Sequence, residues 1–567
     1  MLLVASCARS TSLEPAQALE SAHALAGQGD LEGAIRVLED SLAGHSDNRD
    51  LRLQAARLHA RQGDFVAAEA LLRQLAERGA PPQLWLTDLG EVLLAQQKYF
   101  EVLELSKTTT TTTPVTQLER DLLALRAQLA LPNRDERALV RSLAGLARAR
   151  SSAAPGADSD STLARIDATL ATLRQSEPLV RGGFEHYECA RASPANAASV
   201  APPESRASRR TLRVGARERY KTIAAAAEAA REGDLVEIAA GDYVGDVAFW
   251  PQSDLILRGV GGRPHLKAAG RHSQGKGIWV ISGDNVLVEN IEFSGAQVPD
   301  QNGAGIRFEG RRLTVRGSFF HDNENGILTG NRDDAEVVIE FSEFARNGAG
   351  DGYTHNMYIG HSKSFVLRGS YSHEARVGHL VKSRAAVNQI LYNRLTDEEQ
   401  GSSSYNIDLP DGGRALVIGN QLQQGSRTEN PSMLSFAAER QGGTEDRLYV
   451  AYNTFYNGWL DGIFVDNKSA APAVVVNNAF AGAPGQVLRG PGDTLGYVAT
   501  ARVALADPRE AGFQLGADSF AIDAAVDPPQ AGDWDLQAAF EYVHPAAIRP
   551  RPIIYLRDVG ALEFCGW

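Results

Sequence analysis

Cysteine, aromatic side chains and positive charge are scarce in this sequence of 567 residues. The net charge of −13 argues against nucleic acid as a partner, because phosphate binding requires lysine and arginine clustered over a broad surface. No apolar run of about 18 residues occurs, which argues against a membrane-spanning helix. Of the three cysteines, Cys189 and Cys565 could pair in an oxidising compartment and would stay free in a cytosol.

Glycine is abundant, with 54 residues, which favours short strands joined by turns over large helical cores. The length exceeds what one ordinary core can bury, so we expect two or more domains. Near the N-terminus, the stretch VASC from Val4 to Cys7 resembles the lipobox of bacterial lipoproteins, although the apolar stretch before it is short for a signal peptide. The resemblance implies a residual signal over residues 1–12 and a lipid anchor at Cys7.

The first part of the chain repeats with a period of 34 residues. The segments GDLEGAIRVL, GDFVAAEALL and QKYFEVLEL begin at positions 29, 63 and 97. They share a large apolar position and, three residues later, a small one at Ala34, Ala68 and Val102. This is the period of tetratricopeptide repeats, whose stacked helix pairs usually bind a partner protein. We therefore predict a tetratricopeptide-like helical domain over residues 13–185, interrupted by a loop at Thr108 to Thr113.

A linker rich in alanine, proline and serine is predicted over residues 186–210. Beyond it, a polar residue recurs at a bend after a short strand, at intervals of 23 to 33 residues. The matching positions are the apolar Ile291 in the first coil and then the polar Ser318, Ser342, Ser370, Asn393, Asn420, Asn453 and Asn478. This spacing predicts a right-handed, single-stranded parallel β-helix over residues 211–567, in which equivalent polar side chains stack. An all-β sandwich is the alternative, but its turns would be closer together.

The segment that starts this second half, YKTIAAAAEAAREGDLVEIAAGDYVGDVAFW, resembles the opening of pectate-lyase-type β-helices, with a short helix that caps the first coil. The last segment, from SFAIDAAVDPP to LRDVGALEF, is similar to the closing segment of bacterial members. The resemblance covers about Thr211 to Phe564 and implies the fold. It does not imply one reaction, because lyases, hydrolases, epimerases and adhesins share this scaffold.

Each coil carries another strand whose alternation separates inward from outward side chains. We expect four inward residues, Ile306, Ile327, Met357 and Ile407, and four outward residues, Arg307, Leu328, Tyr358 and Asp408. Five of the twelve histidines lie between positions 321 and 379, at His321, His355, His361, His373 and His379. With Lys382, Arg384 and Tyr405 on the same coils, they form a candidate site.

Three stretches resemble the alginate and chondroitin-B lyase family of β-helix polysaccharide lyases. Tyr358-Ile359-Gly360, Lys382-Ser383 and Asn393 follow the order of the strand ends in that family. The resemblance implies that Lys382 is the Brønsted base. The sequence departs from the family at Asp408, where the family has an arginine. It also departs at His355 and His379, which stand near the strands where the family has acidic calcium ligands.

Elimination from a uronate requires a base for the C5 proton, an acid for the departing oxygen and neutralisation of the carboxylate. Our hypothesis is that Arg384 with His355 or His379 binds the carboxylate and that Lys382 or a histidine takes the proton. Tyr358 or Tyr405 would donate one. In the stretch GHLVKSR, either His379 or Leu380 could point inward, which decides whether His379 reaches the groove. No cofactor or metal site is predicted, although calcium is possible.

Three alternatives to a lyase remain. The same groups without bond cleavage would make a C5 epimerase, and a glycoside hydrolase would need two of the carboxylates Asp408, Asp411, Glu374 and Glu439. A non-catalytic protein could bind sugars on the aromatic residues Tyr358, Tyr405, Phe436 and Phe464. In every case we expect an acidic polysaccharide as ligand, a protein partner for the helical domain, and a lipoprotein of the periplasm or outer membrane of a Gram-negative bacterium.

Overall fold

The computed structural model describes residues 13–110, 113–131, isolated positions between 139 and 172, and then residues 209–440, 445–499, 502–507, 512–516, 519–552 and 556–565. Two compact units are present, one up to Cys189 and one from Ala190 to Cys565. Cys7, Cys189 and most of the predicted linker lie outside the described residues, whereas Cys565 is disulfide-bonded. The last two linker residues, Arg209 and Arg210, already hydrogen-bond to the first coil of the second unit.

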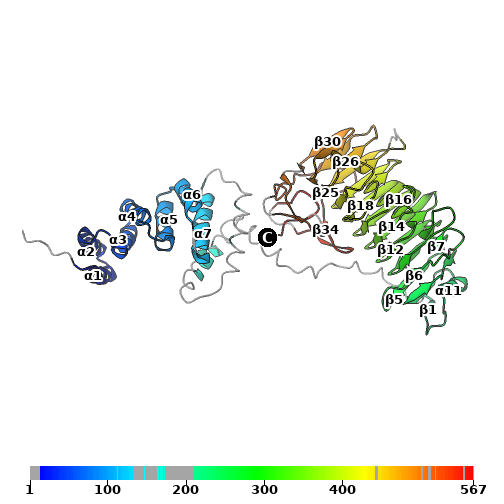
Figure 1. The fold of residues 1–567 in the computed structure, drawn as a ribbon, viewed down its shortest axis with the longest axis horizontal. Helices are drawn as coiled ribbons and strands as arrows, with labels where there is room; N and C mark the ends of the chain where they lie inside the picture. The colour runs from blue at the N-terminus through cyan, green and yellow to red at the C-terminus, as the bar shows by residue number, and fades with distance from the viewer. Residues whose placement is uncertain are drawn as a thin grey trace, which may run out of the picture. The chain divides into compact units, whose positions relative to one another are not determined.

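The first unit consists of antiparallel helix pairs followed by a longer helix (Figure 1). Its described helices are α1 (Pro15–Gly27), α2 (Leu31–Gly44), α3 (Arg49–Gln62), α4 (Phe65–Glu77), the 3-10 helix η1 (Pro82–Leu84), α5 (Leu86–Ala95), α6 (Tyr99–Thr108) and α7 (Pro114–Ala130). Among them, no helix combines the length and apolar character of a membrane span.

The 34-residue period corresponds to the second helix of each pair. Asp30 and Asp64 cap α2 and α4 by accepting the backbone N–H of Gly33 and Ala67. The small repeat positions Ala34, Ala68 and Val102 are fully buried where the helices pack. The threonine run ends α6, and Thr113 caps α7. The predicted tetratricopeptide architecture is therefore confirmed.

The second unit is a right-handed parallel β-helix with three sheet faces (Figure 1). Face 1 comprises β4 (Ala248–Trp250), β7 (Gly277–Ile281), β10 (Ala304–Phe308), β13 (Asn325–Thr329), the first parts of β16 (Met357–Arg368) and β18 (Val381–Leu391), β20 (Ile407–Leu409), β23 (Ser432–Phe436), β26 (Gly462–Asn467) and β29 (Gly485–Arg489).

Face 2 comprises β1 (Thr211–Val214), β2 (Leu235–Ala239), β5 (Ile256–Val260), β8 (Val286–Glu289), β11 (Arg312–Arg316), β14 (Arg332–Glu340), the later parts of β16 and β18, β21 (Arg414–Ile418), β24 (Arg447–Ala451), β27 (Ala473–Val476) and β30 (Gly492–Leu495).

Face 3 is an eleven-stranded sheet formed by β3 (Asp242–Val244), β6 (His265–Lys267), β9 (Glu292–Ser294), β12 (Phe319–His321), β15 (Glu343–Ala345), β17 (Tyr371–His373), β19 (Arg394–Thr396), β22 (Gln421–Gln424), β25 (Thr454–Asn457), β28 (Ala479–Gly482) and β31 (Val498–Ala499).

A ladder of polar side chains holds successive coils together at the bend before face 3. The backbone N–H of Ile291 donates to the Ser318 hydroxyl, and the same bond repeats coil by coil up to Asn453, whose N–H donates to the Asn478 side chain. The predicted bend positions are thus confirmed as one hydrogen-bonded ladder. It satisfies buried N–H groups where the sheets are interrupted.

One continuous apolar core fills the β-helix from Leu212 to Phe480. Three phenylalanines stack in it, with ring centroids 4.8 Å apart for Phe293 and Phe320 and 4.9 Å apart for Phe320 and Phe344. At the first coil, α11 (Ile223–Ala229) packs its apolar side into this core, as predicted for a capping helix. Two terminal hairpins follow the last coils, β32 (Leu505–Asp507) with β33 (Gly512–Leu515) and β34 (Phe540–Val543) with β35 (Ala547–Pro550).

Candidate functional site

A row of outward side chains crosses face 1 from coil to coil. Parallel pairing places Tyr358 beside Lys382, and Lys382 beside Asp408. Met357 and Ile407, each next to a member of the row, are fully buried in the core. The alternation predicted for this strand is therefore confirmed, and it brings three predicted site residues side by side although they are separated by about 25 positions in the chain.

Arg384 follows in the same strand as Lys382 and is hydrogen-bonded on three sides. Its Nε donates to the Tyr358 hydroxyl at 2.9 Å, and its two terminal nitrogens donate to Asp411 and Glu439, both at 2.6 Å. Lys382 Nζ lies 3.5 Å from Asp408 Oδ2 and 4.0 Å from Glu439 Oε1. Glu439 thus bridges the two cations.

The accessibility of these carboxylates differs. The Glu439 side chain is 53% exposed, whereas those of Asp411 and Asp408 are 10% and 5% exposed. Asp411 and Asp408 are therefore fixed parts of the cluster, and Glu439 is the group that solvent or a ligand can displace. Burial raises the pKa of Asp408, and the neighbouring Lys382 opposes this rise.

His355, His379 and Tyr405 form a second row just before the strands of face 1. The His355 and His379 rings stack at 4.5 Å, and the Tyr405 ring lies 5.0 Å from His379. The backbone N–H of His379 donates to His355 Nδ1 at 3.0 Å, so this nitrogen carries no proton. His379 Nε2 lies 3.5 Å from Asp408 Oδ2, which links the two rows. The sequence left open whether His379 or Leu380 points inward. Leu380 is the inward residue, since it belongs to the apolar core.

Neither histidine suits the carboxylate-binding role that the sequence suggested. Burial, with help from His379, lowers the pKa of His355 well below its usual value. Burial and Lys382 lower the pKa of His379 to about 3. Both rings are therefore neutral at neutral pH, and His355 is only 1% exposed. A charged imidazolium does not fit here, and Arg384 is left as the group that neutralises a carboxylate.

The five clustered histidines do not converge in space. His355 and His379 lie beside face 1, and His361 lies at its edge, 3.2 Å from Asp411 Oδ2. His321 and His373 end β12 and β17 and point outward on face 3. The sequence could not separate these groups because a coil of about 25 residues turns through all three faces.

Three other expectations for this face are corrected. Phe436 and Phe464 lie in the core and offer no aromatic surface to a sugar. Glu374 contacts His373 next to face 3 and is remote from the carboxylates of face 1. Asn393 is fully buried in the hydrogen-bonded ladder, in agreement with its predicted bend position.

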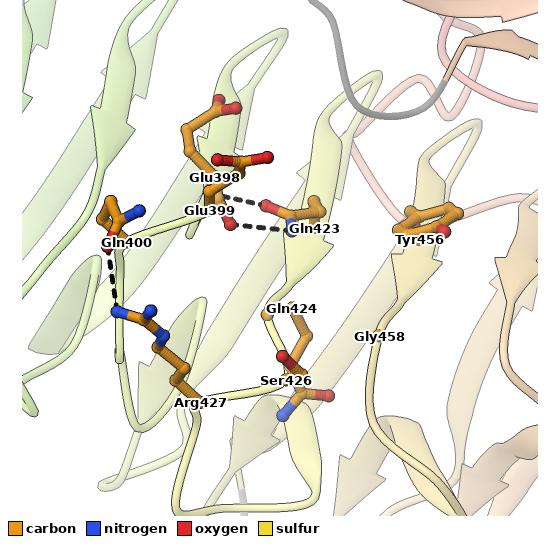
Figure 2. Close-up of a pocket in the computed structure, with 10 residues that line it drawn as sticks. Glu398, Glu399, Gln400, Gln423, Gln424, Ser426, Arg427, Tyr456 and Gly458 are labelled. Carbon is orange, nitrogen blue, oxygen red and sulfur yellow. Dashed lines mark hydrogen bonds between the residues drawn. The ribbon is translucent and has the colours of Figure 1, made fainter.

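Two hollows adjoin these faces. A cavity of about 270 Å³ lies next to Arg384 at the edge of face 1 and is lined by His361, Asp411, Arg440 and Asp446, among others. A larger pocket of about 500 Å³ lies at the turn after face 3, between Glu398, Arg427 and Tyr456 (Figure 2). The sequence did not predict the larger pocket.

Two charged groups of the larger pocket, Glu398 and Arg427, already have partners. Glu398 accepts hydrogen bonds from Tyr371, Arg394 and Thr396. Figure 2 shows the hydrogen bond that Arg427 donates to Gln400. On face 1, by contrast, the exposed carboxylate of Glu439 lies next to the two cations Arg384 and Lys382, and a ligand can displace it. We therefore take face 1 as the candidate functional site in spite of the smaller hollow.

Two family comparisons agree with this architecture. Residues 25–99 match the family described as tetratricopeptide repeat, and residues 269–422 match the family described as right handed beta helix region. The second match includes Tyr358, Lys382, Arg384 and Asp408. No curated protein and no solved structure matches the chain.

Proposed function

We propose that this protein binds an acidic, uronate-containing polysaccharide along face 1 and cleaves it by β-elimination. The observation that carries the proposal is the Glu439 carboxylate, which lies between Arg384 at 2.6 Å and Lys382 at 4.0 Å on the outer face. A uronate carboxylate has the same chemistry and can take this position when Glu439 moves into solvent. The matched right handed beta helix region is compatible with proteins that act on polysaccharides.

The planar guanidinium of Arg384 neutralises the substrate carboxylate and makes the C5 proton more acidic. Lys382 then takes this proton, the electron pair of the C5–H bond forms the C4–C5 double bond, and the C4–O bond breaks. Tyr358 accepts a hydrogen bond from Arg384, so its own hydroxyl hydrogen is free to be donated to the leaving oxygen. The products are a shortened chain and an unsaturated uronate.

Lys382 acts as a base only after it has lost a proton. Asp408 Oδ2 lies 3.5 Å from both Lys382 Nζ and His379 Nε2, and burial raises the Asp408 pKa. The buried carboxyl and the neutral imidazole are therefore suited to take the proton from Lys382 and pass it on. In this proposal His379 acts through Asp408 and does not contact the substrate.

A hydrolase is less compatible with this geometry. Asp411 and Glu439 both accept hydrogen bonds from Arg384, so neither is free to act as the second carboxyl group that a glycosidase needs. A C5 epimerase would use the same groups as a lyase, and the products distinguish the two. A purely sugar-binding face is disfavoured, because two of the four aromatic residues expected on it are in the core.

The test is incubation of the full-length protein with alginate, hyaluronate and polygalacturonate while the ultraviolet absorbance of the unsaturated uronate is followed. We expect absorbance to rise with one of these polymers and Lys382→Ala to abolish the rise. Lys363→Ala is the matched control, because Lys363 lies in β16 as an exposed residue paired with Glu336. A rise that Lys382→Ala leaves unchanged would refute the assigned base. New reducing ends without absorbance would indicate hydrolysis, and altered C5 stereochemistry by nuclear magnetic resonance would indicate epimerisation.

We also infer that the helical unit docks the enzyme to a partner, because stacked tetratricopeptide repeats present a surface for protein binding. A lipid anchor at Cys7 and a location in the periplasm or outer membrane of a Gram-negative bacterium fit the polymer substrate. Membrane fractionation of cells that express the native gene or a Cys7→Ala variant tests the anchor. Release of the variant alone into the soluble fraction is the expected result.

A further inference from the structure

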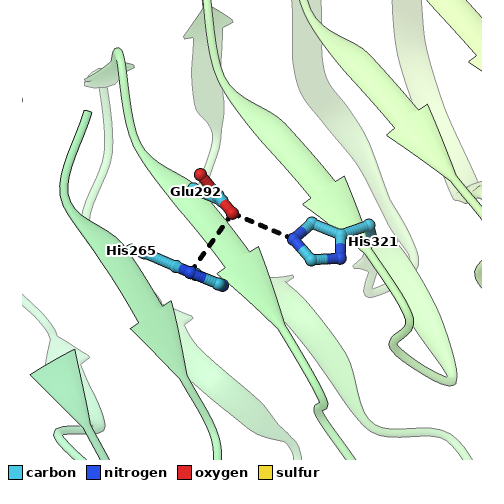
Figure 3. A group of neighbouring side chains, drawn as sticks. All are labelled: His265, Glu292 and His321. Carbon is cyan, nitrogen blue, oxygen red and sulfur yellow. Dashed lines mark hydrogen bonds and ion pairs between the residues drawn. The ribbon is translucent and has the colours of Figure 1, made fainter. Parts of the chain in front are cut away.

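Two histidines and a glutamate from successive coils converge on face 3 (Figure 3). His265 Nδ1 lies 3.2 Å and His321 Nε2 lies 3.1 Å from the same oxygen, Oε1 of Glu292. One candidate ligand atom from each of the three side chains lies within 4.8 Å of the others. The residues belong to β6, β9 and β12, so the arrangement exists only in the stacked fold.

We propose that His265, Glu292 and His321 bind a divalent transition-metal ion of the zinc class. Two imidazoles and a carboxylate are a ligand set that zinc accepts. Donor atoms around a tetrahedral zinc ion with bonds of about 2.0–2.1 Å lie about 3.3 Å apart. The observed separations of 3.1 and 3.2 Å from Glu292 are already close to this value.

The other ring nitrogen of each histidine is held by a second group. His321 Nδ1 lies 2.8 Å from Asp322 Oδ2, and His265 Nε2 lies 2.7 Å from the Ser294 hydroxyl. Metal-binding histidines commonly use such partners to fix the ring and its tautomer. The Phe319 ring also stacks on His321 at 4.4 Å. Both imidazoles are thereby aimed at Glu292 before an ion arrives.

A fourth ligand is close at hand. Asp242 Oδ1 lies 3.8 Å from His265 Nδ1, although the other Asp242 oxygen is bonded to Lys267. The side chains of His265, Glu292 and His321 are 15–22% exposed, so a water molecule can also complete the coordination. An ion at this position would add a further link between three coils and would stabilise the folded state.

The protein contains a natural comparison two strands further along the same face. His373 repeats the pattern of His321: Tyr371 stacks on it at 4.0 Å, Glu343 lies 3.2 Å from its Nε2, and Glu374 lies 2.9 Å from its Nδ1. Among the described residues no second imidazole forms an ion pair with Glu343, and His544 interacts with it only through its electrostatic field. Here the two carboxylates outweigh burial and raise the pKa of His373, as expected for a proton-charged histidine between two acids.

Zinc binding is measured by isothermal titration calorimetry on tag-free, full-length protein freed of metal with a chelator. We expect one ion per chain, a rise in melting temperature on adding zinc, and the visible absorption of tetrahedral cobalt when cobalt replaces it. Glu292→Gln should weaken binding by more than about tenfold, since even changes to outer partners cost about 10–100-fold. Glu343→Gln is the matched control and should keep full binding.

Two results would overturn the proposal. Absence of binding in the native protein would show that the three side chains form a hydrogen-bonded cluster that holds no ion. Equal loss of binding in Glu292→Gln and Glu343→Gln would place the ion elsewhere. His321→Ala is a second variant, with circular dichroism to verify that the β-helix has folded. The outcome is independent of the lyase assay, because Lys382 and Arg384 lie on face 1.

Discussion

The buried asparagine ladder allows a quantitative test of what holds the coils together, through the substitution Asn420→Ala. The Asn420 side chain is fully buried and forms five hydrogen bonds. Its oxygen accepts the backbone N–H and side-chain amide of Asn393, and its nitrogen donates to the carbonyls of Ile390 and Ile418 and to the Asn453 side chain.

The expected loss follows from these bonds. An orphaned buried donor, here the Asn393 N–H, costs about 1–3 kcal/mol, and we take about 0.5 kcal/mol for each of the other lost bonds. Asn420→Ala should therefore lower the free energy of unfolding by about 3–5 kcal/mol, measured by urea denaturation and circular dichroism. Asn302→Ala, at an exposed position, should change it by less than about 0.5 kcal/mol.

The chain itself supplies a rescue variant. Earlier coils place serine at the same bend, and the Ser370 hydroxyl accepts the Ser342 N–H at 3.2 Å. Asn420→Ser should restore an acceptor for the Asn393 N–H and recover about 1–3 kcal/mol relative to alanine. Equal stability of the alanine and serine variants would refute the role assigned to the ladder. A loss below about 1 kcal/mol for alanine would do the same.

Two further predictions concern face 1. Glu439→Gln removes the carboxylate that competes with the substrate for Arg384 and Lys382. Because an exposed ion pair is worth about 0.2–1 kcal/mol, KM for the polyuronate should fall about 1.5–5-fold. Glu399→Gln, at an exposed position, is the control. An unchanged or higher KM would contradict displacement of Glu439. The pKa of His379 is about 3 in the folded protein and about 6.5 in the unfolded chain, so the unfolded chain binds the extra proton as the pH falls. The contribution of His379 to stability is therefore present above pH 6.5 and is lost as pH falls below it. His379→Gln should therefore reduce the slope of unfolding free energy against pH by up to about 1.4 kcal/mol per pH unit between about pH 6 and pH 4. A slope that His379→Gln leaves unchanged, measured by urea titrations at several pH values, would refute the assignment.

The parts of the fold that depend on repetition were predictable from the sequence. The 34-residue period identified the helix pairs, since Ala34, Ala68 and Val102 must be small for the helices to approach. The ladder was predictable because a bend residue whose side chain bonds to the previous coil has to recur once per coil. Strand alternation then gave the row that contains Tyr358 and Asp408, because side chains in a strand alternate strictly between core and surface.

The parts that depend on which face a residue occupies were not predictable. His321 and His379 belong to the same histidine-rich stretch and lie at different faces, because the turns between strands vary in length and hide the position within a coil. Phe436 was expected outside and lies in the core, since Ser435 takes the outward position beside Asp408. The His265, Glu292 and His321 cluster has no local spacing that resembles a metal motif. Only the pairing of His265 with Glu292 in neighbouring strands reveals it.

This dependence on stacking also explains how one chain can carry two separate groups of polar residues. Neighbouring parallel strands are about 4.8 Å apart, so side chains at equivalent positions of adjacent coils are always within reach of one another. The turns between strands project outward, and changes in their length leave the rows in place, as the intervals of 23 to 33 residues between ladder positions demonstrate. A row on face 1 and a row on face 3 are separated by the apolar core and share no side chain. Substitutions in the lysine and arginine cluster should therefore leave the histidine and glutamate cluster intact, and the two proposed activities can be tested and altered independently.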